Sequence, residues 1–213
     1  MFKDRIDAGK RLSQVLEKYK NAGNAVVFAI PRGGVVVARV VCDYLNIPLD
    51  IVVARKIGAP FNEELAIGAV VPGGRIILNE DAVTILRVSE GYIEKQRQRK
   101  IEEIKRRLEK YRGSDAYGNL EGKTAIIVDD GIATGYTVKA AVEFVRSLNA
   151  GRIIVAAPVI APDTLRELQD LVDEVAYIYS GEPFYAVGQF YREFPQVQDD
   201  EVLTMLKNES KGE

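Results

Sequence analysis

Histidine is absent from the 213 residues of this chain. Its absence excludes the serine and cysteine nucleophile systems that use histidine as the base, and it excludes histidine-ligated metal centres. The one cysteine, Cys42, has no partner for an internal disulfide and lies in the apolar run of residues 35–45. We therefore expect a buried thiol, and a reducing, cytoplasmic compartment follows most simply.

Long apolar runs and charge bias are also missing. No signal-like segment opens the chain and no apolar run reaches the length of a membrane span, so a soluble protein without a membrane partner is expected. The 29 basic and 31 acidic side chains nearly balance, which makes nucleic acid an unlikely partner. The length and a hydrophobic content of 47% suffice for one α/β domain with a full core.

The most specific pattern is TAIIVDDGIATGYTVKAA, residues 124–141. The apolar, mostly β-branched residues 125–128 predict a strand buried in a parallel sheet. Asp129 and Asp130 follow where this strand leaves the core. A helix is predicted after the loop, because the apolar residues Val138, Ala141, Val142 and Val145 recur at helical spacing. The motif is thus a strand, an acidic pair, a tight loop and a helix.

This motif suits a sugar phosphate. The start of a helix presents unpaired N–H groups and a partial positive charge, so residues 134–137, with Gly135 and two hydroxyls, can hold a phosphate. Asp129 and Asp130 would repel that phosphate, but they can accept hydrogen bonds from hydroxyls or from a hydrated divalent cation nearby. The alternative is an ordinary strand-to-helix turn with capping threonines.

The strand, the acidic pair and the DGIATGYT loop resemble the 5-phosphoribosyl 1-diphosphate (PRPP) signature of type I phosphoribosyltransferases. The resemblance implies a ribose and 5′-phosphate site made by Asp129, Asp130, Gly131, Ile132, Ala133, Thr134, Gly135, Tyr136 and Thr137. It implies Mg²⁺ as the cofactor, held indirectly by Asp130 through Mg-PRPP. It also implies catalytic roles for Arg32, Lys56, Asp129 and Asp130.

A second strand–loop–helix pattern precedes this one. Residues 25–30 predict a buried strand, and Pro31, Arg32, Gly33 and Gly34 turn it into a helix over residues 35–45. Backbone N–H groups at the two glycines can approach an anion closely, and Arg32 adds a cationic fork. The PRGG sequence is similar to the diphosphate loop of the same family, which implies diphosphate binding by Arg32, Gly33 and Gly34. The alternative is a glycine turn with a surface arginine.

A projecting arm is predicted next. Residues 51–54 predict a strand that delivers Arg55 and Lys56 at its end, and residues 65–71 and 75–78 flank a Pro-Gly-Gly turn typical of a hairpin. The resemblance implies that Lys56 reaches the diphosphate and that residues 62–64 lie on a mobile catalytic loop. Solvated surface charges are the alternative for Glu63 and Glu64.

Residues 81–111 are strongly helical in pattern, with Ser89 as a cap. Residues 95–112 contain nine basic and three acidic side chains, a net charge of +6. A solvated helix face is the simpler interpretation. A PRPP-sensing regulator of the same fold, which binds nucleic acid through this helix, is the alternative function.

Strands at residues 152–159 and 175–179, with a helix at 163–171 between them, complete the pattern. We predict one domain over residues 1–213, built on a doubly wound five-stranded parallel sheet with helices on both faces and a core of about residues 10–180. The diphosphate loop, Arg55 with Lys56 and the PRPP loop would meet at the carboxyl ends of the strands. Residues 199–207 predict a last short helix.

The aromatic stretch 181–198 predicts a small C-terminal hood. Its rings, with Tyr185 or Tyr191 among them, could cover a planar acceptor, as the hood of the resembled family does. Equally, they could form a satellite core against Phe2 and Arg5 of the amino terminus.

The function predicted from the resemblance is a phosphoribosyltransferase, a Mg-dependent glycosyltransferase of nucleotide salvage, which releases diphosphate as a nitrogenous acceptor takes the sugar. Homo-oligomers are expected at the level of the family. Ala133 stands where hypoxanthine-type relatives have a carboxylate, so a general base must come from elsewhere, with Glu64 and Glu182 as candidates. The chain has no G-x-G-x-x-G after its first strand, which argues against a dinucleotide-binding oxidoreductase.

Overall fold

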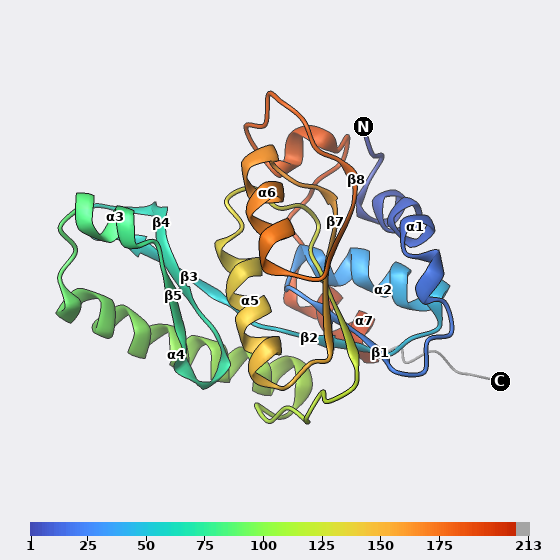
Figure 1. Cartoon of the computed structure of the whole chain (residues 1–213), viewed down its shortest axis with the longest axis horizontal. Coiled ribbons are helices and arrows are strands. Elements are labelled where there is room, and N and C mark those ends of the chain that lie inside the picture. The colour runs from blue at the N-terminus through green and yellow to red at the C-terminus, as the bar shows by residue number, and fades with distance from the viewer. Residues whose placement is uncertain (208–213) are drawn as a thin grey trace.

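The computed structural model describes residues 1–207 except for the side chain of Glu64. The candidate base at Glu64 therefore lies outside the described part. The chain forms a core sheet covered by helices and an arm that projects from one side of it (Figure 1). Among the described residues, no helix combines the length and the apolar character needed to cross a membrane.

The core sheet has five strands, all parallel, in the order β2-β1-β6-β7-β8. The strands are β1 (Ala25–Ala29), β2 (Leu49–Ile51), β6 (Thr124–Val128), β7 (Arg152–Val159) and β8 (Glu174–Tyr179). Strand order reverses between β1 and β6, where the chain moves from one half of the sheet to the other. The predicted doubly wound sheet is confirmed, and its reversal point lies between the two predicted loops.

Alternating residues of each strand face opposite layers of helices. On β6, Ile126 and Val128 face the layer that contains α1 (Arg5–Val15) and α2 (Gly33–Leu45). Ala125 and Ile127 face the layer of α5 (Tyr136–Ser147) and α6 (Pro162–Leu171). Both faces are buried, which explains why the strands read as continuous apolar runs.

The arm is a second, antiparallel sheet of β3 (Arg55–Ala59), β4 (Asn62–Val70) and β5 (Ile76–Leu78), in the order β3-β4-β5. The 3-10 turn η2 (Pro72–Gly74) joins β4 to β5, and its two glycines have φ of 81° and 78°. The predicted hairpin is thus confirmed, since only glycine adopts such angles at little cost. Two helices follow, α3 (Glu80–Ile85) and α4 (Glu90–Arg112), and Ser89 caps α4 as predicted.

One predicted boundary is wrong. We expected a strand over residues 51–54 with Arg55 and Lys56 at its end, but β2 ends at Ile51 and β3 begins at Arg55. The Val52 N–H still donates to the Ala29 carbonyl of β1 at 2.9 Å, and the Val53 side chain still packs in the core. From Arg55 on, the chain pairs with β4 instead. The two cations therefore open the first strand of the arm.

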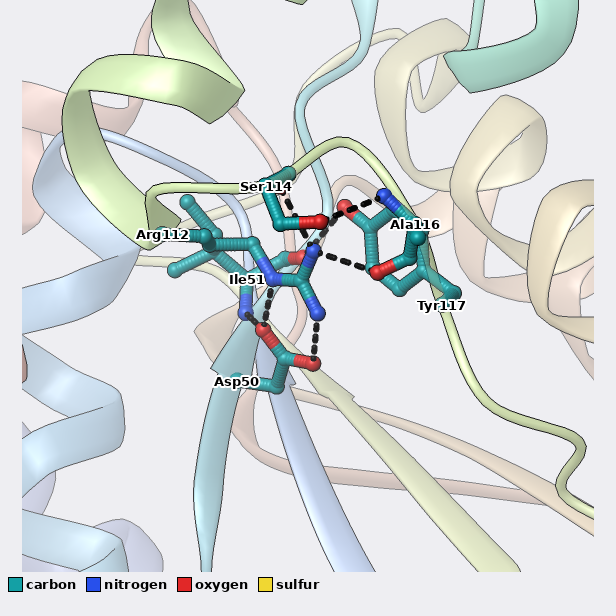
Figure 2. A network of polar contacts seen from close by, with 6 residues as sticks. All are labelled: Asp50, Ile51, Arg112, Ser114, Ala116 and Tyr117. Atoms are coloured by element: carbon teal, nitrogen blue, oxygen red, sulfur yellow. Dashed lines mark hydrogen bonds and ion pairs between the residues drawn. The ribbon is translucent and has the colours of Figure 1, made fainter.

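The end of α4 is fastened to the edge of the core sheet by Arg112 (Figure 2). Its guanidinium donates two hydrogen bonds to the Asp50 carboxylate on β2, at 2.6 and 3.0 Å, and two more to the carbonyls of Ser114 and Ala116, at 2.9 and 2.8 Å. The Tyr117 hydroxyl donates to the Ile51 carbonyl at 2.9 Å. These bonds secure the return of the chain from the arm to the core.

The C-terminal hood packs on the amino terminus. The Phe2 N–H donates to the Phe190 carbonyl at 2.7 Å, and the Arg192 N–H donates to the Phe2 carbonyl at 2.9 Å. Around these bonds lies a satellite core that includes Phe2, Tyr191 and Phe194, as the second of our two interpretations of this stretch predicted. Short 3-10 helices lie at η1 (Glu17–Tyr19) and η3 (Val187–Phe190), and α7 (Asp199–Lys207) closes the described chain.

Candidate active site

The two predicted anion loops lie side by side because they follow neighbouring strands, β1 and β6. A Cβ atom on Gly33 would lie 1.9 Å from Oδ2 of Asp130, and one on Gly34 would lie 2.9 Å from the Val128 carbonyl oxygen. No side chain fits in either place. The glycines of the PRGG loop thus allow it to pack directly against the acidic pair.

The acidic pair is partly buried and strongly constrained. Oδ1 of Asp129 accepts a hydrogen bond from the Asp130 N–H at 2.8 Å, and Oδ2 of Asp130 lies 2.6 Å from Nε of Arg5. Burial, and next the negative charge of Asp130, raise the pKa of Asp129 well above its ordinary value. The pair therefore resists carrying two full negative charges.

The loop that follows is held from outside by the end of β7 and the start of α6. The Ile132 N–H donates to the Val159 carbonyl at 2.9 Å, and the Ala161 N–H donates to the Ile132 carbonyl at 2.9 Å. The Thr164 hydroxyl, on α6, donates to the Ala133 carbonyl. These three bonds tie residues 132 and 133 of the loop to β7 and α6 and fix the loop's shape.

Both loops end in helices without side-chain caps. Gly135, with φ of 73°, is the N-cap of α5, and Arg32 is the N-cap of α2, and neither helix start has a side-chain hydrogen bond. In contrast, Asp4, Asn79 and Ser89 cap α1, α3 and α4 through their side chains. Helix starts whose N–H groups have no side-chain cap are suited to bind anions.

Arg32, on the PRGG loop, reaches the last helix, α7. Its Nη1 is 3.5 Å from Oδ1 of Asp199, the first residue of α7. Asp199 also accepts hydrogen bonds from Lys110 at 2.7 Å and from the Tyr111 hydroxyl at 2.6 Å, and these bonds lower its pKa to about 2. The carboxylate therefore stays ionised beside Arg32 at neutral pH.

Lys56 lies on β3, in the arm rather than on a core loop. With Arg55, Glu63 and Lys100 it lines a polar cavity of about 200 Å³. The arm is joined to the loop that follows Asp130 by a hydrogen bond from the Asn79 side chain to the Tyr136 hydroxyl. This link connects the N-cap of α3 to the first residue of α5.

The predicted acceptor residues lie apart. Tyr185 is 86% exposed, whereas Tyr191 is 6% exposed in the satellite core, and its hydroxyl donates to the Asp130 carbonyl at 2.5 Å. Glu182, a candidate base, is exposed. An acceptor role for either tyrosine, and a proton-transfer role for Glu182, stay predictions.

Three residues shape this site in ways that the sequence did not predict. Arg5, expected only to pack beneath the hood, contacts Asp130, and Thr164 contacts the Ala133 carbonyl from α6; no local pattern marks either contact. Asn79 could have been found, because an Asn before two acidic residues, Glu80 and Asp81, is typical of a helix N-cap.

A parallel sheet with two anion loops at its reversal point, a projecting arm and a hood defines the architecture of a type I phosphoribosyltransferase. The family model described as the phosphoribosyl transferase domain matches residues 3–193. The chain belongs to this family.

Known relatives agree with this assignment. Two proteins of Mycobacterium tuberculosis are 40% identical to this chain over 206 residues. Each is named a putative phosphoribosyl transferase. The alignment covers 97% of this chain and 46% of each relative, so the chain spans about half their length.

Solved structures show the same fold. The protein TT1426 from Thermus thermophilus is 36% identical with a TM-score of 0.78, and the match covers 96% of this chain and 97% of that one. A purine phosphoribosyltransferase from Pyrococcus horikoshii is 20% identical with a TM-score of 0.51, over 93% of this chain and 97% of that one. At that identity the second match speaks for the fold alone.

Proposed function

We propose that this protein transfers the 5-phosphoribosyl group from PRPP to a small nitrogenous acceptor and releases diphosphate. The observation that carries the proposal is the packing of Gly33 and Gly34, at the uncapped start of α2, directly against Asp129 and Asp130. The loop that begins with this acidic pair then leads to the uncapped start of α5 at Gly135. PRPP has a phosphate at one end, a diphosphate at the other and hydroxyls between them. The site offers groups of matching chemistry in the same order.

The start of α5 would bind the 5′-phosphate, because residues 134–137 supply N–H groups and hydroxyls there. Asp130 and Asp129 would accept hydrogen bonds from the ribose hydroxyls. Arg32 and the N–H groups of Gly33 and Gly34 would bind the diphosphate, and Lys56 would join them from the arm. Because Lys56 is on β3, its contribution requires movement of the arm or of its long side chain.

The residues fit a magnesium ion that arrives with PRPP. Among the side chains that the structure describes, which leave out that of Glu64, no three acidic, cysteine or histidine groups gather as a metal site. Mg²⁺ is commonly bound through one or two carboxylates, water and substrate phosphates, and Asp129 and Asp130 supply such carboxylates. When bound, it would neutralise charge on the diphosphate. Asp130, held by Arg5, is the residue we expect to hold it indirectly.

The chain's own residues would act by positioning and charge. Transfer at the anomeric carbon passes through a cationic sugar as the diphosphate departs, so no protein nucleophile is needed and the lack of histidine is no obstacle. Arg32 and Lys56 would stabilise the departing negative charge. Because residue 133 is alanine, no carboxylate at that position could move a proton of the acceptor.

The alternative regulator is less well supported. Its premise is the excess of cations in residues 95–112, but five of these nine cations make ion pairs. They are Arg97, Arg99, Lys100, Lys110 and Arg112. These ion pairs reduce the positive electrostatic potential that the helix would present to a nucleic acid.

Calorimetry with PRPP, ribose 5-phosphate and pyrophosphate in Mg²⁺ tests the proposal. Asp130→Asn should weaken PRPP and ribose 5-phosphate binding by about 1.5–3 kcal/mol, the usual size of a charge-assisted hydrogen bond. Thr134→Val should weaken the same two ligands. Arg32→Ala should weaken pyrophosphate and PRPP but spare ribose 5-phosphate. Asp170→Asn, an exposed acid at the far end of α6, is the matched control.

Turnover is tested by following diphosphate release from PRPP with a panel of purines, pyrimidines and related bases. Base-dependent release would support the transferase. An absence of release, combined with salt-sensitive RNA or DNA binding that PRPP modulates, would favour the regulator. Unchanged PRPP affinity in Asp130→Asn would refute our assignment of the site.

A further inference from the structure

A buried cation from the amino terminus reaches the acidic pair. Arg5 is the first residue of α1, and only 8% of its surface is exposed. A buried charge is costly unless it is paired and hydrogen-bonded. The partners that offset this cost are therefore informative about what Arg5 does.

The Arg5 guanidinium makes three different contacts. Nε lies 2.6 Å from Oδ2 of Asp130, Nη1 donates to the Pro195 carbonyl at 2.7 Å, and Cζ lies 3.7 Å from the centre of the Phe194 ring. The stacked ring and the carbonyl fix the plane of the guanidinium. Its orientation toward Asp130 is thus set by the hood and not by Asp130 alone.

A second hood residue holds the main chain of the same aspartate. The Tyr191 hydroxyl donates to the Asp130 carbonyl at 2.5 Å. The Tyr191 ring is fixed between Phe2 and Phe194, with centroid distances of 5.3 and 4.8 Å. Arg5 and Tyr191 therefore restrain both the carboxylate and the carbonyl of Asp130.

Close packing leaves the carboxylate little freedom. A Cβ on Gly33 would lie 1.9 Å from Oδ2 of Asp130 and 2.9 Å from Nε of Arg5, so the ion pair borders the diphosphate loop directly. A carboxylate has about four lone-pair positions on two oxygens. With Oδ2 held by Arg5, Oδ1 is the oxygen left to accept from a ribose hydroxyl.

We propose that Arg5 and Tyr191 are positioning residues that hold Asp130 in the geometry needed to bind the ribose of PRPP. This inference rests on the proposed function. It gives the hood a second task besides covering an acceptor: the hood orients the acid that recognises the sugar. The N-terminal segment then becomes part of the sugar site through its contact with Asp130.

A double-mutant cycle tests whether Arg5 acts through Asp130. The variants are Arg5→Ala, Asp130→Asn and the double variant, titrated with ribose 5-phosphate and with pyrophosphate. Arg5→Ala should weaken ribose 5-phosphate binding roughly ten-fold and leave pyrophosphate binding unchanged. In the Asp130→Asn background it should cause no further loss, because there is no carboxylate left to orient.

Conservative and control variants separate positioning from general stability. Arg5→Lys should restore part of the affinity, since it keeps the charge but not the planar fork. Tyr191→Phe keeps the packed ring and removes only the hydroxyl, so it tests the proposal even if Arg5→Ala fails to fold. It should show a smaller loss for the same ligand. Arg11→Ala, an exposed arginine on the same helix that lies over Phe2, should change neither affinity.

Two outcomes would overturn the proposal, and they differ from failure of the proposed function. Equal losses for both ligands, or a loss from Arg5→Ala that persists in the Asp130→Asn background, would show that Arg5 only supports the fold. If Asp130→Asn alone left ribose 5-phosphate affinity unchanged, the assignment of the sugar site itself would be wrong, and the positioning role would fall with it.

Discussion

Replacing Asp199 with asparagine tests how α7 is fastened beside the diphosphate loop. The carboxylate accepts hydrogen bonds from Lys110 and the Tyr111 hydroxyl, and it lies 3.5 Å from Arg32. Asparagine preserves the shape of the side chain and removes its charge. We expect a less stable protein, because two cations and a hydroxyl lose their ionised partner.

The size of the loss follows from the pKa of this carboxyl group. The hydrogen bonds from Lys110 and then Tyr111 lower the pKa of Asp199 from 3.8 to about 2. A difference of about 1.8 corresponds to about 2.4 kcal/mol, at 1.36 kcal/mol for each pKa unit. The side chain is 34% exposed, so water screens the pair and we expect about 1 kcal/mol instead. For a chain of this length the Tm should fall by about 2–4 °C.

The loss should depend on pH in a defined direction. The pKa of Asp199 is lower in the folded state than in the unfolded chain, so its stabilisation is complete above the unfolded value, about 3.9. The stabilisation is lost as the pH falls toward about 2. Thermal scans should therefore give a constant Tm difference between pH 5.5 and 7, and roughly half of it near pH 3.

Asp200→Asn is the matched control for this experiment. It removes the same charge from the first turn of the same helix, but its side chain is exposed. We expect its Tm to differ little from that of the unmodified protein. Equal Tm values for the two variants, or a difference that does not shrink at pH 3, would refute the reasoning.

Two other substitutions test the edge of the core and the acidic pair. Arg112→Lys loses the bidentate hydrogen bonding to Asp50 and should lower the free energy of unfolding, measured in urea titrations, by about 1.5–3 kcal/mol. Arg166→Lys, in an exposed ion pair with Asp163, is the control and should have almost no effect. Asp129→Asn should raise the Tm, because burial and Asp130 raise the pKa of Asp129 and so disfavour its ionised form. As pH rises above 4, the unmodified protein must ionise Asp129 at a cost in stability that the asparagine variant does not have, so the gain in Tm should grow from pH 4 to pH 8. The same substitution should weaken PRPP binding. A variant with a lower Tm than the unmodified protein at pH 8 would contradict the burial argument.

Local patterns in the sequence were enough to predict the sheet, the hairpin and the two anion loops. Buried parallel strands read as short apolar runs, helices repeat at 3.6 residues, and a tight turn needs glycine. Each of these signals is carried by neighbouring residues. The loops at Gly33 and Gly135 could be predicted for the same reason, since each follows directly from a strand and opens a helix.

The tertiary structure alone decided which distant residues complete the site. Arg5 and Asp130 are 125 positions apart, and Tyr191 and Asp130 are 61 positions apart, so no periodicity or spacing could connect them. The boundary at Arg55 was mispredicted because pairing with β4, and not the composition of residues 51–54, sets the start of β3. A charged side chain near the amino terminus resembles any solvated one until the folded chain places the hood over it. Burial then makes a partner necessary.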